Sequence, residues 1–374
     1  MKKTAVLMIS EYYVPHWTGI VITFHEIAKN LIFQGYDMTV LTTKYDNKIP
    51  HKEVVDGVNI IRVPYFIRLS RTHYSIEIIF TFLKILSRFQ TIVINSPNSN
   101  ILFFTVIAKL FGKKVIIYHQ GDLELPHQTG NQLNNRVMEI IFDVFTIPSF
   151  LLADKAVTYT RDYAVNSRVM KYSLDKFQSY IPFLKLPNAK PSQDFIRKTA
   201  HLRRYILIGL AGRFVEEKGY DVLLKAIPGI AKKIKNVRFV FAGATNMEYE
   251  SFFEENHLLI KKNKDNLVFL GLLSRADLKH FYKMLDVFVI SSRSDCFPTT
   301  QIEAALQGVP IVVTDIPGAR MLVKTTGFGE IVEGENIKAL EDGVVKIIKN
   351  KEKYNQNATH VSTFIKNNDT FKLY

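Results

Sequence analysis

Short apolar runs alternate with longer amphipathic segments along the whole chain. A run such as residues 5–9 is continuously apolar, as expected of a parallel strand buried on both faces. A segment such as 24–32 instead repeats its apolar residues at helical spacing. The pattern predicts strands at 5–9, 38–41, 58–63, 92–94, 115–118, 156–158, 205–210, 237–242, 267–270, 287–290 and 311–313. It predicts helices at 24–32, 75–89, 101–111, 137–145, 220–234, 247–262, 275–284, 300–307 and 337–348.

The alternation is interrupted once, by a polar segment with three prolines between residues 182 and 204. We therefore predict an N-terminal domain at 1–187, a linker at 188–204 and a C-terminal domain at 205–350. A helical tail at 351–374 is expected to pack back on the first domain. Strand–helix alternation predicts parallel sheets with helices on both faces. The expected fold class is α/β, with two doubly wound, Rossmann-like domains facing a central cleft, where such sheets bind ligands at their carboxyl ends.

Composition narrows the classes of partner and site. The single cysteine, Cys296, excludes an internal disulfide and a cysteine-based zinc cluster. No apolar run approaches the roughly 20 residues of a membrane span, and the first run is shorter than a secretory signal. We expect a cytoplasmic protein, soluble or peripheral on the inner face of the cell membrane. The net charge of +14 attracts polyanions, but it forms no known nucleic-acid-binding module.

The stretch from Arg62 to Arg88 is both basic and aromatic, with Glu77 as its one acid. Basic residues among aromatic ones are typical of a membrane interface. A solvated loop followed by a core helix gives the same pattern, and the sequence leaves both interpretations open. The residues proposed for an acceptor or membrane face are Arg62, Arg68, Arg71 and Arg88.

Two turns that follow predicted strands suit a diphosphate. In the first, Gly19 opens a helix and lets backbone N–H groups approach an anion closely. This turn lacks the G-x-G-x-x-G pattern, which argues against a dinucleotide enzyme. In the second, Arg213 and Lys218 flank a helix start, where a guanidinium, an ammonium and free N–H groups combine. Ion pairs with Glu216 and Glu217 are the alternative role of these two cations.

A third turn, SSRSDCFPTTQIEAALQGVP at 291–310, follows the predicted strand at 287–290. Pro298 suits the first turn of the next helix. The free N–H groups of Thr299 and Thr300 can hold an anion. The carboxylate of Glu303 can accept hydrogen bonds from two ribose hydroxyls.

This segment resembles the E-x7-E signature of retaining GT-B glycosyltransferases of family 4, here as Asp295-x7-Glu303. The segments 212–219 and 15–19 are similar to the donor-phosphate motif and the N-terminal glycine loop of that family. The resemblance covers nearly the whole chain. Three positions depart from the family pattern, since Asp295 replaces the usual Glu, Pro298 a common Gly, and Ile20 the second glycine of the loop.

The resemblance implies a role for each matched residue. Arg213 and Lys218 would neutralise the donor diphosphate, Glu303 would bind the ribose, and Asp295 would contact the transferred sugar. His119, at a predicted strand end, would orient the donor sugar or its acceptor face. The remaining donor-binding residues would be Gly19, Ile20, Pro298, Thr299 and Thr300.

The resemblance therefore predicts a hexosyl- or glycosyltransferase that moves a sugar from a UDP- or GDP-sugar to a glycan or lipid-linked acceptor, in bacterial surface polysaccharide synthesis. The acceptor would bind the first domain and the nucleotide sugar the second. No metal or other cofactor is expected, because the two cations supply the positive charge. A sugar-nucleotide 2-epimerase of the same fold and a catalytically silent partner subunit are the alternatives.

Overall fold

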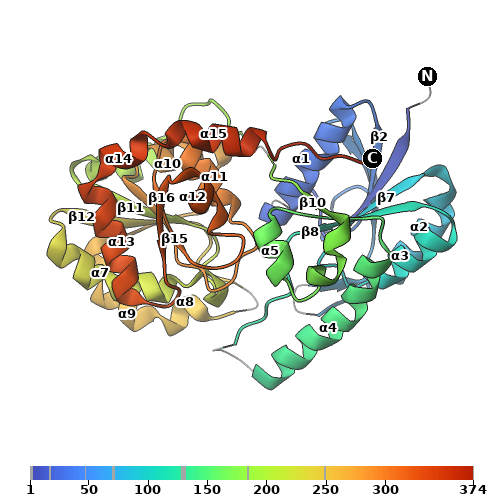
Figure 1. Ribbon diagram of the computed structural model, residues 1–374, viewed down its shortest axis with the longest axis horizontal. Helices are drawn as coiled ribbons and strands as arrows, with labels where there is room; N and C mark the ends of the chain where they lie inside the picture. Colours follow the sequence, from blue (N-terminus) through green and yellow to red (C-terminus); the bar gives the residue numbers. More distant parts are fainter. Residues whose placement is uncertain are drawn as a thin grey trace. The chain divides into compact units, whose positions relative to one another are not determined.

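The computed structural model describes residues 3–16, 18–46, 48–69, 72–127, 132–182, 185–247 and 250–373. The chain divides into two compact units, each an α/β fold with a central sheet (Figure 1). The first unit contains residues 1–125, 133–183 and 368–374, and the second contains 126–132 and 184–367. The predicted α/β class and its two sheets are confirmed.

The first unit is built on one sheet with the strand order β10-β9-β8-β7-β1-β2-β4-β3, parallel throughout except that β3 pairs antiparallel with β4. The helices α2, α3 and α4 pack on one face of this sheet, because their buried residues share a cluster with Leu7 and Ile9 of β1. Helix α1 lies on the other face, where Phe24 stacks on Tyr118 (Figure 1). The strands are β1 (Ala5–Ile9), β2 (Asp37–Thr43), β3 (Lys52–Val55), β4 (Val58–Val63), β7 (Thr91–Ser96), β8 (Lys114–His119), β9 (Lys155–Thr158) and β10 (Phe177–Ser179), with a separate hairpin of β5 (Ile67–Leu69) and β6 (Thr72–Tyr74). The helices are α1 (Gly19–Phe33), α2 (Ile76–Ile85), α3 (Ile101–Leu110), α4 (Gln132–Leu152) and α5 (Arg161–Asn166), with short 3₁₀ turns at Leu86–Arg88 and Met170–Lys176.

The second unit has a wholly parallel sheet with the order β13-β12-β11-β14-β15-β16. The strand β11 lies at its centre, and the chain leaves it to one side and returns to the other. The loops after β11 and β14 therefore meet at the carboxyl edge of adjacent strands. The strands are β11 (Ile206–Ala211), β12 (Val237–Ala242), β13 (Leu267–Gly271), β14 (Val287–Ile290), β15 (Ile311–Thr314) and β16 (Gly329–Val332). The helices are α6 (Gln193–Thr199), α7 (Tyr220–Lys233), α8 (Phe252–Glu255), α9 (His257–Lys262), α10 (Arg275–Lys283), α11 (Thr299–Leu306), α12 (Met321–Thr326), α13 (Ile337–Lys349), α14 (Lys351–Asn355) and α15 (Ala358–Lys366), with 3₁₀ turns at Ala200–Arg204, Glu216–Lys218 and Lys264–Asn266.

The structure corrects the predicted linker and tail. Residues 188–204 belong to the second unit and contain α6, which Ser192 caps by accepting a hydrogen bond from Phe195 N–H. Within the predicted tail, α14 and α15 also belong to the second unit, because α15 buries Val361 and Ile365 against α11 and α12. Only residues 368–374 join the first unit, where Asn368 accepts a hydrogen bond from Ile181 N–H at 2.7 Å.

The sequence pattern missed short elements and misjudged some boundaries. Strand β3, the hairpin β5–β6, β10 and β16 were not predicted, since each has only three or four residues and too few positions to show a period. Helix α4 extends well beyond the predicted 137–145, through Pro148. The predicted helix at 247–262 begins at Phe252 in the structure and is divided into α8 and α9, while residues 248 and 249 lie outside the described residues.

Arg62 does not belong to a surface that could face an acceptor or a membrane. Its side chain is 1% exposed and forms an ion pair with Glu53 and hydrogen bonds with the carbonyls of Val14 and Pro50. It lies on β4, an interior strand of the sheet, and successive side chains of a strand point to opposite faces. Arg88 is exposed, with its guanidinium 5.9 Å from the ring of Phe89. The backbone of Arg68 lies in β5, and Arg71 lies outside the described residues.

Candidate functional site

The loops after β11 and β14 are joined by a set of hydrogen bonds in the second unit. The Arg293 guanidinium donates to both carboxylate oxygens of Asp221, at 2.8 and 3.0 Å. The Arg293 amide donates to Glu217 O, and Ser291 Oγ donates to Lys218 O at 3.0 Å. Gly219 permits this approach, because it has a φ of 62° and a side chain there would lie 2.0 Å from the carbonyl of Ser291. We call these contacts of Arg293 and Ser291 with residues 217–221 the clamp. The clamp fixes the turn at 216–219 beside the loop at 291–298.

Lys218 and Asp295 are brought into contact by this clamp. Lys218 Nζ lies 2.6 Å from Asp295 Oδ2 and 3.6 Å from Glu217 Oε1, and Arg213 Nη2 lies 3.1 Å from the same Glu217 oxygen. Burial favours the neutral amine, but the carboxylates of Asp295 and Glu217 outweigh it and raise the pKa of Lys218 above its usual value. Two cations, Arg213 and Lys218, therefore lie next to two carboxylates at the turn 216–219. The ion pairs with Glu217 show that the alternative role of Arg213 and Lys218 is also realised.

Cys296 follows Asp295 in this loop and is not suited to nucleophilic chemistry. Burial, with the nearby Asp295 charge, raises the pKa of its thiol well above the usual value. Because the thiolate is the reactive form, Cys296 stays neutral and unreactive at physiological pH.

Helix α11 begins directly after this loop. Pro298 occupies its N-cap position rather than its first turn, and no side chain within the described residues caps the helix. The amides of Thr299 and Thr300 thus stand at an uncapped positive helix end, as an anion site requires. The pattern gave no signal for Gln301, which is fully buried and whose amide has no hydrogen-bond partner among the described residues. A buried amide of this kind usually bonds to water or a ligand.

Glu303 is buried and held by a tyrosine of α10. Tyr282 Oη donates to Glu303 Oε2 at 2.9 Å, and Arg275 Nη1 lies 3.9 Å from Oε1. Burial raises the pKa of Glu303, while the hydrogen bond from Tyr282 and the Arg275 charge oppose that rise. Tyr282 was not singled out from the sequence, because its partner lies 21 positions away.

We expect Tyr282→Phe to lower the free energy of unfolding by about 1–3 kcal/mol, since it leaves a buried carboxylate short of one donor. It should also raise the pKa of Glu303 further. A raised carboxyl pKa makes the native state hold its proton to higher pH than the unfolded chain, so stability falls as pH rises from about 4.3 through the folded pKa. In the variant this fall should extend to higher pH. Urea unfolding across pH measures both effects, and Tyr172→Phe, at an exposed hydroxyl, is the control.

In the first unit, His119 ends β8 and lies in a polar network. Its Nδ1 is 3.1 Å from Ser96 Oγ, and its Nε2 is 3.1 Å from Asp122 Oδ1. Ser167 Oγ donates to the same Asp122 oxygen at 2.7 Å. Burial opposes ionisation, but the interactions with His119 and Ser167 hold the pKa of Asp122 well below its usual range. Asp122 thus fixes the His119 ring, a role that the sequence did not reveal.

The N-terminal turn leads into α1 at Gly19. A side chain at Gly19 would meet nothing within 4 Å, so the fold itself does not require glycine here, and Ile20 is 40% exposed. At the end of β1, the carboxylate of Glu11 accepts a hydrogen bond from Ser99 N–H at 2.7 Å. Burial raises the pKa of Glu11 to about 7. Glu11 is a further candidate acid or base that the sequence analysis did not name.

Each unit is matched by a known family model. Residues 192–360 match the family described as glycosyl transferases group 1, and residues 17–164 match glycosyltransferase family 4. A phosphatidylinositol N-acetylglucosaminyltransferase subunit of Saccharomyces cerevisiae is 20% identical over 92% of this chain and 76% of its own length. A capsular polysaccharide biosynthesis glycosyltransferase of Staphylococcus aureus is 31% identical over 38% of this chain and 36% of its own.

One solved structure is similar over nearly the whole chain. Anabaena HepE in complex with UDP-glucose superposes with a TM-score of 0.70 and is 14% identical, covering 97% of this chain and 95% of that one. The fold and the two family matches, which together cover most of both units, identify the chain as a glycosyltransferase of the GT-B fold.

Proposed function

We propose that this glycosyltransferase moves a sugar from a UDP- or GDP-sugar to a lipid-linked or glycan acceptor, with retention of configuration, in surface polysaccharide synthesis. The observation that carries the proposal is the clamp between the loops after β11 and β14. It places Lys218 against Asp295, which lies four residues before the uncapped start of α11. The names of two relatives, which refer to phosphatidylinositol and to capsular polysaccharide biosynthesis, support an acceptor of this kind.

The chemistry follows from charge. As the glycosidic bond breaks, negative charge grows on the departing diphosphate. Lys218, Arg213 and the amides of Thr299 and Thr300 would stabilise that charge more in the transition state than in the bound donor, which is what lowers the barrier. Glu303 would accept hydrogen bonds from the ribose, and Asp295 would contact the transferred sugar. These cations supply the positive charge, so the transfer should need no divalent metal.

Retention follows from the resemblance of Asp295-x7-Glu303 to the family signature. The donor's own phosphate oxygen would take the acceptor proton on the face that the leaving group vacates. The first unit would bind the acceptor. There both ring nitrogens of the buried His119 already have partners, Ser96 and Asp122, so the imidazole would position this network for sugar hydroxyls rather than bind them directly.

A thermal-shift panel of nucleoside diphosphates and their sugars tests the proposal. Ligands that bind only the native state raise its melting temperature, by the equivalent of about 2.7 kcal/mol at 100-fold excess over Kd. We expect UDP or GDP to give such a shift. Glu303→Gln, which keeps an acceptor for Tyr282 but removes the charge, should abolish most of it, whereas Glu254→Ala, at an exposed position of α8, should not.

Two results would contradict the proposal. One is the absence of a shift with every diphosphate. The other is a change in the donor's stereochemistry without any acceptor, which would favour an epimerase.

A further inference from the structure

Helix α4 of the first unit exposes a broad apolar surface. Its nine large exposed apolar side chains are each at least 43% accessible, with Ile140 at 62% and Val144 at 59%. Its two acids turn away from that surface. Glu139 is buried and accepts a hydrogen bond from Leu125 N–H at 2.7 Å, and Asp143 accepts one from Arg168 Nε at 2.7 Å. The exposed surface of α4 is therefore mainly apolar, and neither of its acids is exposed.

Helices α2 and α3 continue this surface, because they pack on the same face of the sheet as α4 (Figure 1). A shallow groove of about 370 Å³ between α3 and α4 is lined mainly by Phe103, Val106, Ile107 and Phe145. We call the exposed apolar residues of these three helices, together with Phe111 directly after α3, the helical face. They are Ile76, Phe80, Leu83, Leu110, Phe111, Leu133, Val137, Met138, Ile140, Ile141, Val144, Phe145, Leu151 and Leu152.

The charges on these helices are almost all positive. The exposed residues Lys84, Arg88 and Arg136 lie on or directly after α2 and on α4, and Glu77 is the one exposed acid of the described part of the three helices. A second copy of the chain docked on this face would bring these cations together with only Glu77 of each copy to pair with them. An anionic bilayer satisfies both features, since acyl chains accept the apolar side chains and headgroups attract the cations.

We propose that the helical face docks on an anionic lipid bilayer, with α4 lying in the plane of the interface. Among the described helices, none combines the length and the hydropathy needed to cross a membrane. Docking would therefore be peripheral, with apolar side chains inserted at the depth of the headgroups. The docking itself is argued from the helical face alone. Its purpose rests on the proposed function, because a lipid-linked acceptor is presented at a membrane surface.

Flotation with vesicles tests the docking. Wild-type protein should float with phosphatidylcholine vesicles that contain phosphatidylglycerol and should bind pure phosphatidylcholine more weakly. Salt that shortens the Debye length to about 3 Å should reduce the difference. Ile140→Ser combined with Val144→Ser should weaken binding at least about tenfold, because two inserted apolar side chains are lost. The matched control is Phe33→Ser, at a residue that is 91% exposed on α1, on the opposite face of the sheet.

Equal flotation of wild type and the double variant would overturn the proposal, as would wild-type protein that does not bind anionic vesicles. Sedimentation that shows a dimer, converted to monomer by the double variant, would assign the helical face to self-association instead. Melting temperature establishes that each variant is folded. A nucleotide-induced shift without vesicle binding would contradict only the docking proposal. Vesicle binding without any nucleotide-induced shift would contradict only the proposed donor site.

Discussion

Lys218→Ala should lower kcat for sugar transfer by about 10²–10³-fold, because it removes a cation positioned where the diphosphate charge develops. The clamp holds Lys218 in place, and the carboxylates of Asp295 and Glu217 keep it protonated through neutral pH by raising its pKa against the effect of burial. Loss of the ammonium should also weaken the binding of nucleoside diphosphate. Initial rates at saturating donor and acceptor measure the first effect, and thermal shift measures the second.

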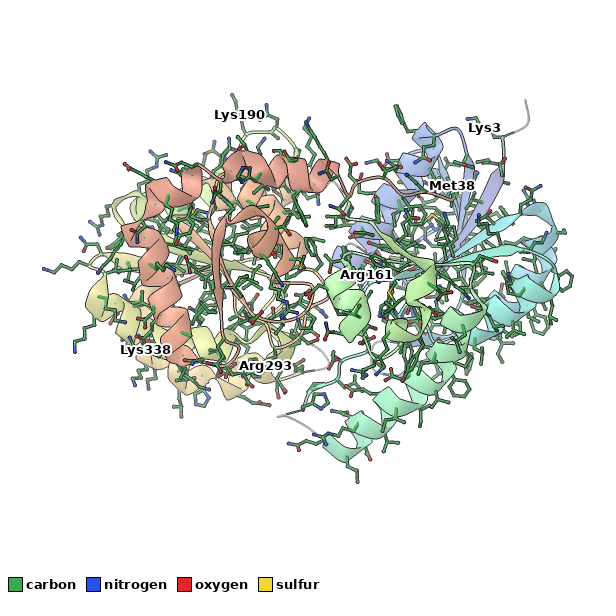
Figure 2. All side chains as sticks on the ribbon, viewed as in Figure 1. Lys3, Met38, Arg161, Lys190, Arg293 and Lys338 are labelled. Carbon is green, nitrogen blue, oxygen red and sulfur yellow. The ribbon has the colours of Figure 1, made fainter. Side chains whose placement is uncertain are left out.

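Two further variants make this result specific. Lys338→Ala removes a lysine that is 66% exposed on α13 and pairs with Asp342, and it should leave kcat unchanged (Figure 2). Lys218→Arg keeps the charge but changes its shape, so it should recover part of the activity. A kcat for Lys218→Ala within about threefold of wild type would show that the transition state does not depend on this ammonium.

The sequence predicted the fold well because buried parallel strands and the helices between them leave distinct periods. The resemblance gave the turns at 212–219 and 291–300 separate donor-binding roles. In the structure both turns follow strands at one edge of the sheet, and Lys218 lies against Asp295. The chemical roles of these residues stay predictions.

Other features could not be read from the sequence, because they depend on pairs far apart in the chain. Tyr282 is held against Glu303 by the packing of α10 on α11, and Asp122 reaches Ser167 across 45 positions. The pattern of charged residues along the sequence likewise does not show which charged side chains are buried. Arg62 has the same neighbours in sequence as a surface arginine would, yet it forms a buried ion pair with Glu53. Hydrophobic periods predict which elements form, but they do not specify the partners of individual polar side chains.

Arg293→Ala should destabilise the second unit by about 2–3 kcal/mol, since it breaks a bidentate pair in which Asp221 is only 6% exposed and Arg293 16%. The loss should fall short of that for an isolated buried pair, because Lys225 remains 2.9 Å from Asp221. Urea unfolding followed by circular dichroism measures the change. Arg320→Ala is the control, because Arg320 pairs at 3.0 Å with an Asp315 that is 53% exposed, and such a pair should contribute less than about 1 kcal/mol (Figure 2 labels Arg293).

The same variant has a pH signature that separates an ion pair from packing. Burial opposes ionisation of Asp221, but hydrogen bonds from Arg293 and Lys225 outweigh it and hold its pKa below the usual value. The stability from this pair is therefore complete above the unfolded pKa of about 3.9 and is lost as pH falls through the lower folded pKa. The difference between wild type and Arg293→Ala should be constant from pH 7 to 5 and should narrow below about pH 4. A difference that persists unchanged into acid would mean that the Arg293 side chain stabilises this unit through its packing rather than through its charge.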